Sequence, residues 1–342
     1  QERGHDDFVV RFQQTTGPVM AKGVEDTAFY RYFRLAALNE VGGNPARFGV
    51  TVDEFHEANA QHARRFPRRL LTTYTHDTKR SPDARARIVA LTWLVDEWRT
   101  KLAAWRDALG PLEDPREELL VLQTLVGAAP IERGRLDAYL EKALREGKVN
   151  TNWLAPNTGH EAKVKEWAAR ASELVEDDPF LERVREIGRR LALSQLFLKL
   201  VSPGVADIYR GDELDDLSLV DPDNRRPVDW AARREALAAL RAGAPPDAQT
   251  AKLYVTWRTL RFRAEHDDAF AGTYEPYDLG AGVCAFVRGG TVLAAAAVDP
   301  FVTPRAPHGW RDVLGVDGLL LCGTRGDDSR LVGEHHRLDA IS

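Results

Sequence analysis

The chain reads LLTTYTHDTKRS at residues 70–81, a short apolar and β-branched run that ends in a cluster of polar and charged side chains. Two other segments have the same form: residues 16–21 lead into KGVED at 22–26, and residues 205–209 lead into GDE at 211–213. Short strands followed by helical stretches are typical of parallel β/α units. The pattern predicts three parallel strands whose polar clusters lie at their carboxyl ends, which is the active-site face of a (β/α)8 barrel.

A long helical stretch separates the second predicted strand from the third. Ser81, Pro82 and Asp83 predict a helix start, since Ser can cap, Pro fits the first turn and Asp favours the positive end of the helix. Apolar side chains then recur at helical spacing and predict a core face, at Ile88, Leu91, Val95 and Trp98. Breaks are expected at residues 110–111 and 147–159.

After a linker at residues 242–246, a helix through residue 263 and closely spaced short apolar runs predict an antiparallel β-sandwich. The fold class we predict is therefore α/β, the C-terminal part of a (β/α)8 barrel with a helical insertion, followed by this sandwich. The expected boundaries are 1–80 for barrel strands and helices, 81–200 for the helical insertion subdomain, 201–241 for the end of the barrel and 250–342 for the C-terminal β-domain.

Composition narrows the classes of protein that fit. Of the 342 residues, 44% are hydrophobic and 29% are charged, with a net charge of −5, which argues against disorder. Positive and negative side chains are interleaved, so no nucleic-acid partner is expected. Cys284 and Cys322 have no metal-ligand spacing, so no metal site is expected, and two cysteines are too few for a disulfide scaffold, which fits a reducing cytoplasm. No cofactor is expected. No signal segment or membrane-spanning run is evident, and Gln1 with a lone Met20 suggests that residue 1 is not the natural start.

The residues most suited to chemistry follow the second predicted strand. His76 and Asp77 would place hydrogen-bonding groups and a carboxylate where a sugar ring can bind, although most such pairs are structural or lie on the surface. Lys79 and Arg80 would keep Asp77 ionised, because nearby cations favour the charged form.

Further binding candidates lie elsewhere. Lys22 and Glu25 follow the first predicted strand, where Asp26 is expected to cap a helix at Thr27 rather than to act in acid/base work. Tyr30 offers a ring for stacking on glucose, with core packing as the alternative. The remaining candidates are Trp153, a possible sugar platform in a polar loop, and Asn224 and Arg225, in a proline-stiffened loop at residues 221–229 that suits a binding edge or a solvated turn.

Longer motifs resemble one family. Residues 12–32, FQQTTGPVMAKGVEDTAFYRY, look like a signature of the maltooligosyl trehalose synthases, as do residues 75–81 and the blocks at 201–204, 207–209 and 217–227. The His76 and Asp77 pair is shared across the α-amylase superfamily of glycoside hydrolases, whereas the first and last motifs are specific to this family. The resemblance covers residues 8–230 and corresponds to the C-terminal half of such an enzyme.

The resemblance implies an isomerase, a glucosylmutase of trehalose biosynthesis that converts the reducing-end α-1,4 bond of a maltooligosaccharide into an α,α-1,1 bond. A nucleophilic Asp and an acid/base Glu, about 5 Å apart as retention requires, would lie in strands before residue 1. This chain alone is therefore expected to be inactive without the missing N-terminal half of the barrel. Asp77 would stabilise the oxocarbenium-like transition state and His76 would bind the same sugar.

By the same resemblance, Lys22, Lys79 and Arg80 would line subsites near the cleaved bond, and the helical insertion would act as a lid that excludes water. Departures from the family pattern stand at Phe33, Asn150, Asn152 and Asp215. The alternatives are an α-glucan hydrolase, another transglucosylase of the superfamily, or a non-catalytic glucan-binding fragment. In every case the expected partner is a maltooligosaccharide or α-glucan, with no membrane involved.

Overall fold

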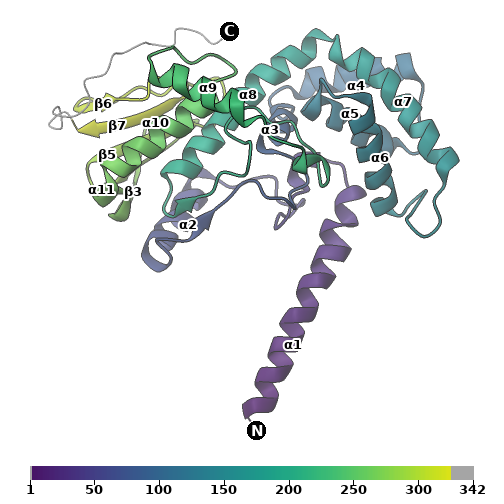
Figure 1. Ribbon diagram of the computed structural model, residues 1–342, viewed down its shortest axis with the longest axis horizontal. Coiled ribbons are helices and arrows are strands. Elements are labelled where there is room, and N and C mark those ends of the chain that lie inside the picture. The colour runs from purple at the N-terminus through teal and green to yellow at the C-terminus, as the bar shows by residue number, and fades with distance from the viewer. Residues whose placement is uncertain (1, 325–342) are drawn as a thin grey trace. The chain divides into compact units, whose positions relative to one another are not determined.

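The computed structural model describes residues 2–324, which divide into two compact units (Figure 1). Unit 1 comprises Gln1–Phe48, Asp77–Val184 and Leu217–Arg225, and unit 2 comprises Gly49–His76, Arg185–Asp216 and Arg226–Ser342. None of the helices in the described residues combines the length and apolar character that crossing a bilayer requires.

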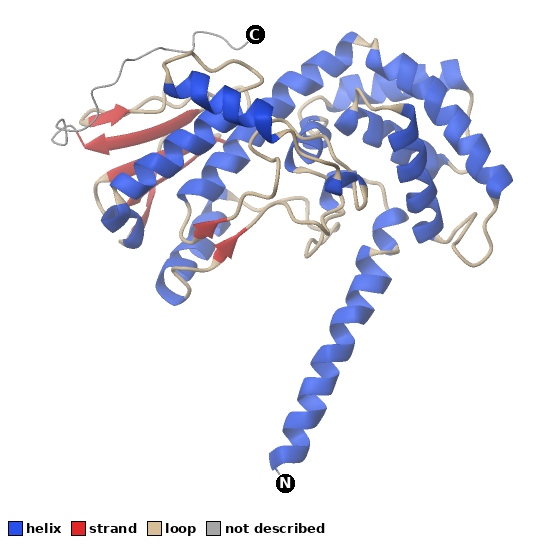
Figure 2. Ribbon diagram, viewed as in Figure 1, coloured by secondary structure: helices blue, strands red, loops and turns tan. Residues whose placement is uncertain are grey.

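Unit 1 is built from helices and turns (Figure 2). Its longer helices are α1 (Glu2–Met20), α3 (Pro82–Ala90), α4 (Val95–Leu109), α5 (Pro115–Ala128), α6 (Arg133–Gly147) and α7 (Thr158–Glu176). Its short helical turns are η1 (Ala21–Glu25), η2 (Ala28–Tyr30), η3 (Ala36–Leu38) and η4 (Asp223–Arg225). Helix α8 (Pro179–Val201) begins in unit 1 and continues into unit 2. The predicted helical stretch and its breaks at Gly110 and after Gly147 are confirmed.

Helix α5 lies at the centre of this core, where nearly all of its residues from Glu117 onward are buried. It contacts α3 closely at Gly127, where an added Cβ would lie 2.9 Å from the carbonyl oxygen of Ala84. Ser81 caps α3 as predicted, since its side chain accepts from the Ala84 amide. The predicted stripe is wrong at Val95, which is 43% exposed, because the helix breaks between α3 and α4 and Leu94 is buried instead.

The predicted strand at residues 16–21 is also wrong. These residues complete α1 and begin the π-helical turn η1, and the side chains from 6 to 20 are exposed. A strand needs neighbouring strands to take its backbone N–H and C=O groups, whereas a helix satisfies them internally. No strand pairs with this segment among the described residues, so the helix is the conformation that leaves fewer backbone groups unpaired.

Unit 2 contains the other two predicted strands, in shortened form. β1 (Leu70–Leu71) pairs in parallel with β2 (Val205–Ala206), with Leu70 opposite Val205. The parallel arrangement is confirmed, but the strands do not reach residues 75 and 209 as predicted. Beyond β1, the Thr72 hydroxyl donates to the Tyr74 carbonyl at 2.7 Å and accepts from the Tyr74 amide at 3.3 Å. Such local bonds compete with strand pairing and end the ladder.

The C-terminal part of unit 2 holds one antiparallel sheet, in the order β3-β4-β5-β7-β6. Its strands are β3 (Tyr274–Tyr277), β4 (Val283–Arg288), β5 (Val292–Ala297), β6 (Trp310–Asp312) and β7 (Leu319–Thr324), and the helices of unit 2 are α2 (Val52–Arg65), α9 (Trp230–Arg241), α10 (Ala251–Glu265) and α11 (Asp267–Ala271). Val255 and Phe262 of α10 pack with Phe286 of β4 in one core cluster. The antiparallel prediction is confirmed, but the described strands form a single sheet covered by helices on one face rather than a sandwich of two sheets.

Candidate functional site

The two residues with the strongest sequence signal lie in the connection between β1 and α3. His76 is the last residue of its segment in unit 2, and Asp77 is the first of the next segment in unit 1. Both side chains are exposed, whereas Thr78, Lys79 and Arg80, which follow directly, are buried. The connection therefore presents the carboxylate of Asp77 to solvent and turns its basic neighbours inward.

Asp26 holds two of the predicted binding lysines. Its carboxylate oxygens lie 2.6 Å from Lys22 Nζ and 3.0 Å from Lys79 Nζ. Partial burial acts to raise the pKa of Asp26, but the hydrogen bonds from both lysines outweigh it and hold that pKa below its usual value. The hydrogen bond to Asp26 likewise raises the pKa of Lys22, whose side chain is exposed.

This arrangement corrects two predictions. Asp26 does not cap a helix at Thr27, because Thr27 is itself the residue before η2 and Asp26 is held by lysines. Lys79, which was expected to keep Asp77 ionised, has its ammonium bound to Asp26. The spacing of four residues between Lys22 and Asp26 was the available sequence signal for the first contact. Glu25 accepts from the Gly42 amide at 3.0 Å and so ties η1 to a later turn.

Tyr30 and Arg80 lie in the core of unit 1 rather than on a binding surface. Lys79 Nζ lies 5.7 Å from the centroid of the Tyr30 ring, and burial raises the pKa of Tyr30 well above its usual value. The Tyr30 hydroxyl is buried and has no hydrogen-bond partner among the residues that the structure describes. The Arg80 guanidinium donates to the Tyr139 hydroxyl at 2.8 Å. Both side chains therefore pack inside unit 1.

Trp153, unlike Tyr30 and Arg80, lies at the surface, as a ring that stacks on a sugar must. It is 50% exposed in the loop between α6 and α7, and Arg145 Cζ lies 5.0 Å from its ring centroid. Arg145 is held by a two-pronged pair with the buried Glu161, both contacts at 2.9 Å. Thr151 also donates to Glu161, at 2.6 Å, so this carboxylate joins the loop that carries Trp153 to Arg145 of α6.

The two candidate binding residues in the loop at residues 221–229 differ in exposure. Arg135 binds the Asp223 carboxylate through two hydrogen bonds of 2.8 Å and fixes the turn η4. Asn224 is buried, whereas Arg225 is about half exposed and pairs with Asp221. Only Arg225 is therefore placed at a surface where it can meet a ligand.

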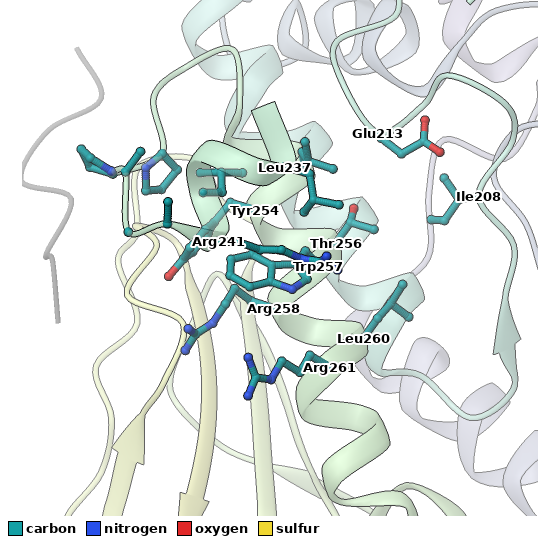
Figure 3. A pocket seen from close by; sticks show the side chains of 17 residues that line it. Ile208, Glu213, Leu237, Arg241, Tyr254, Thr256, Trp257, Arg258, Leu260 and Arg261 are labelled. Carbon is teal, nitrogen blue, oxygen red and sulfur yellow. The ribbon is translucent and has the colours of Figure 1, made fainter. Parts of the chain in front are cut away.

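A cavity of about 1300 Å³ lies in unit 2, between α9, α10 and the linker that joins them (Figure 3). Its walls include Tyr254, Trp257 and Arg258, and none of the predicted site residues lines it. Among the described residues there is no group of three or more His, Cys, Asp or Glu side chains that could hold a metal ion.

These features define a mixed α/β protein with a parallel strand pair, a helical unit and a C-terminal antiparallel sheet. No protein-family model matches the chain. The chain is 40% identical, over 335 residues, to putative maltooligosyl trehalose synthases of Mycobacterium tuberculosis, a match that covers 89% of this chain and 42% of those proteins. Over most of its length, the chain is therefore similar to the C-terminal part of the maltooligosyl trehalose synthases.

Solved structures agree with this assignment. Maltooligosyltrehalose synthase from Arthrobacter ramosus matches with a TM-score of 0.84 and 35% identity, over 92% of this chain and 46% of that one. A hypothetical maltooligosyl trehalose synthase from Sulfolobus tokodaii matches with a TM-score of 0.80 and 32% identity, also over 92% and 46%. The chain thus spans less than half the length of the relatives that it matches.

Proposed function

We propose that this chain supplies the C-terminal part of an intramolecular transglucosylase that acts on maltooligosaccharides. The reaction converts the reducing-end α-1,4 bond into an α,α-1,1 trehalosyl bond. The observation that carries this proposal is the similarity to maltooligosyl trehalose synthases over about nine tenths of the chain, in sequence and in three-dimensional structure.

We propose that Asp77 stabilises the oxocarbenium-like transition state and that His76 binds the same sugar. The exposure of both side chains supports this assignment, since a group that contacts substrate must be accessible. A carboxylate contributes most when positive charge develops on the sugar, so its effect falls on turnover more than on binding. The nucleophile and the acid/base are two further carboxylates, which we assign to the part of the relatives that this chain does not match.

The β1 and β2 pair belongs, in this proposal, to a (β/α)8 barrel whose carboxyl-end loops carry the site. The parallel register of Leu70 with Val205 supports it, because parallel strands joined through helices are the repeating element of such barrels. Lys22 and Arg225 are exposed and are proposed to contact the glucan. Trp153 is proposed to close over the sugar and keep water from the freed glucose.

The test uses a hybrid in which this chain replaces the matching part of the Mycobacterium tuberculosis relative. Incubated with maltopentaose, the hybrid should form a trehalosyl product, and Asp77→Asn should lower turnover by about 3 kcal/mol of transition-state stabilisation, or more than a hundredfold. Asp107→Asn is the matched control, since Asp107 is an exposed aspartate on α4. Free glucose without trehalosyl product would instead support a hydrolase. Binding of maltopentaose with no reaction would support a glucan-binding protein.

The same assay on the chain alone tests our proposal that it is inactive without the two further carboxylates. We expect neither glucose nor trehalosyl product. Release of either would show that residues of this chain perform the roles that we assign elsewhere.

A further inference from the structure

We propose that Glu40 is a positioning residue for Asp77, an inference that rests on the catalytic role proposed for Asp77. Glu40 follows η3 and is 8% exposed, and it is far from Asp77 in the sequence. Its carboxylate binds the backbone of Lys79 and Arg80, which lie two and three residues after Asp77. We infer that this contact fixes where the exposed carboxylate of Asp77 lies.

Both oxygens of Glu40 take part. Oε1 accepts from the Lys79 amide at 2.8 Å and from the Val41 amide at 2.8 Å. Oε2 accepts from the Arg80 amide at 3.3 Å and lies 3.9 Å from Arg85 Nε. Two successive backbone N–H groups therefore converge on one carboxylate, and hydrogen bonds with an ionised partner are about twice as strong as neutral ones.

The segment that Glu40 holds is also fixed at its far end. The Ser81 amide donates to the Ser218 carbonyl at 2.9 Å, and the Ser81 side chain accepts from the Ala84 amide at the start of α3. The backbone from Lys79 to Ser81 consequently has a hydrogen bond at each residue. Asp77 is separated from this fixed backbone by Thr78 alone, so few dihedral angles remain to place its carboxylate.

Glu40 is itself held by a buried frame. Asn39 donates to the carbonyls of Phe29 at 3.0 Å and Tyr32 at 2.5 Å. In the same segment, Gln123 of α5 accepts from the Ala36 amide at 2.7 Å and donates to the Phe33 carbonyl at 2.8 Å. These contacts tie the turn that carries Glu40 to the central helix of unit 1. Because this turn is fixed, the Glu40 carboxylate stays in one place and holds the Lys79 and Arg80 amides there.

The chemistry of the contact requires a carboxylate of this length. Every partner named above is an N–H donor, and a carboxylate offers only acceptors, whereas the amide of glutamine would turn its own N–H₂ toward one of those donors. Aspartate is shorter by one methylene group and cannot reach the Lys79 and Arg80 amides without movement of the backbone. Glutamine is therefore a substitution that keeps the size of the side chain while removing part of the hold on residues 79 and 80.

The first measurement is hydrogen exchange of the peptide that covers residues 77–81, in this chain and in its Glu40→Gln variant. We expect these amides to exchange at least tenfold faster in the variant, since an opening that loses about 1.4 kcal/mol of stabilisation becomes tenfold more frequent. Glu118→Gln is the matched control. Glu118 is also buried in unit 1, accepts from the Leu112 amide at 2.8 Å and pairs with Arg106, so its loss should not change exchange at residues 77–81.

The second measurement is turnover of maltopentaose by the hybrid described above. We expect Glu40→Gln to lower kcat about a hundredfold while KM changes less than about threefold, because a shift on the order of 1 Å in a catalytic group has this effect on rate. Glu118→Gln, which perturbs the fold elsewhere, should leave kcat within about threefold of the unchanged hybrid.

The two measurements separate the inference from the function on which it rests. Faster exchange with lowered kcat supports the proposal, and unchanged exchange at residues 77–81 in Glu40→Gln overturns it. If exchange is faster but neither Glu40→Gln nor Asp77→Asn lowers kcat, then the catalytic assignment of Asp77 is wrong, although Glu40 still fixes the segment. If Asp77→Asn abolishes turnover and Glu40→Gln does not lower it, the positioning role is refuted and the proposed function stands.

Discussion

Replacing Gly204 by alanine should weaken unit 2 at the junction that brings β1 and β2 together. Gly204 directly precedes β2 and has a φ of +137°, a conformation that L residues rarely adopt. A Cβ built on it would lie 2.7 Å from the Arg69 carbonyl oxygen and 2.7 Å from Leu71 Cγ, which belongs to β1. The first of these atoms is backbone and cannot turn aside as a flexible side chain can.

Two costs add at this position. The backbone conformation costs an L residue about 1–2 kcal/mol, offset in part by about 0.4–1 kcal/mol from the lower entropy of the unfolded chain. Forcing a methyl group against fixed neighbours costs about 1–3 kcal/mol more. We therefore expect a loss of about 3 kcal/mol in the free energy of unfolding. For a domain of 150–250 residues, this lowers Tm by about 6–12 °C.

Gly243 provides the matched control, because it also has a positive φ, of +96°, but nothing lies within 4 Å of an added Cβ. Gly243→Ala should cost only about 1 kcal/mol, the backbone part alone. The assay is urea unfolding of both variants and the unchanged chain, followed by tryptophan fluorescence. If Gly204→Ala is no more destabilising than Gly243→Ala, then the close approach of residue 204 to β1 does not limit the pairing of β1 with β2.

Three further outcomes are expected. In the hybrid, Trp153→Ala should raise the ratio of free glucose to trehalosyl product, because a looser covering admits water, and an unchanged ratio would leave Trp153 with a packing role. Tyr30→Phe should leave the free energy of unfolding unchanged or slightly higher, since no described residue makes a hydrogen bond with the buried hydroxyl, and a loss above about 1 kcal/mol in chemical unfolding would contradict this. His56 Nδ1 lies 2.7 Å from the Tyr274 hydroxyl, and burial holds the pKa of His56 below its usual 6.5. The neutral imidazole therefore contributes to the free energy of unfolding above pH 6.5, and this contribution is lost as the pH falls through the lowered pKa. Unfolding between pH 7.5 and 5 should show this loss in the unchanged chain and less of it in His56→Gln.

Sequence reasoning succeeded where a local capping signal or the alternation of strands and helices indicates the structure. The start of α3 depends on Ser81, whose side chain satisfies an amide three residues away, and such capping is visible in a sequence. The parallel relation of residues 70–71 and 205–206 followed from the rhythm of strands and helices. The strand expected at residues 16–21 failed for the opposite reason, because whether an extended segment forms depends on strands far away in the chain.

The candidate site shows the same contrast between what the sequence indicates and what depends on distant residues. Sequence identified residue types that suit a glucan, but it could not show which side chains turn inward. Arg80 donates to Tyr139, and Lys79 donates to Asp26, each more than fifty residues away. Glu40 gave no signal at all, because a single glutamate in an otherwise unremarkable turn does not reveal that two later amides will bind it.

The two lysines on Asp26 illustrate why exposure must accompany residue type in assigning a role. Lys79 is 4% exposed, and a buried ammonium is tolerated only when it is paired, so we expect loss of its contact with Asp26 to destabilise unit 1. Lys22 is 78% exposed and shares the same carboxylate, so its charge remains hydrated whether or not the contact forms. Removing Lys22 leaves Asp26 paired with Lys79, whereas removing Lys79 leaves a cavity and disturbs the core around Tyr30. Of the two, Lys22 is therefore the side chain that we propose contacts a sugar, and we expect Lys79 to act on the site only through the fold.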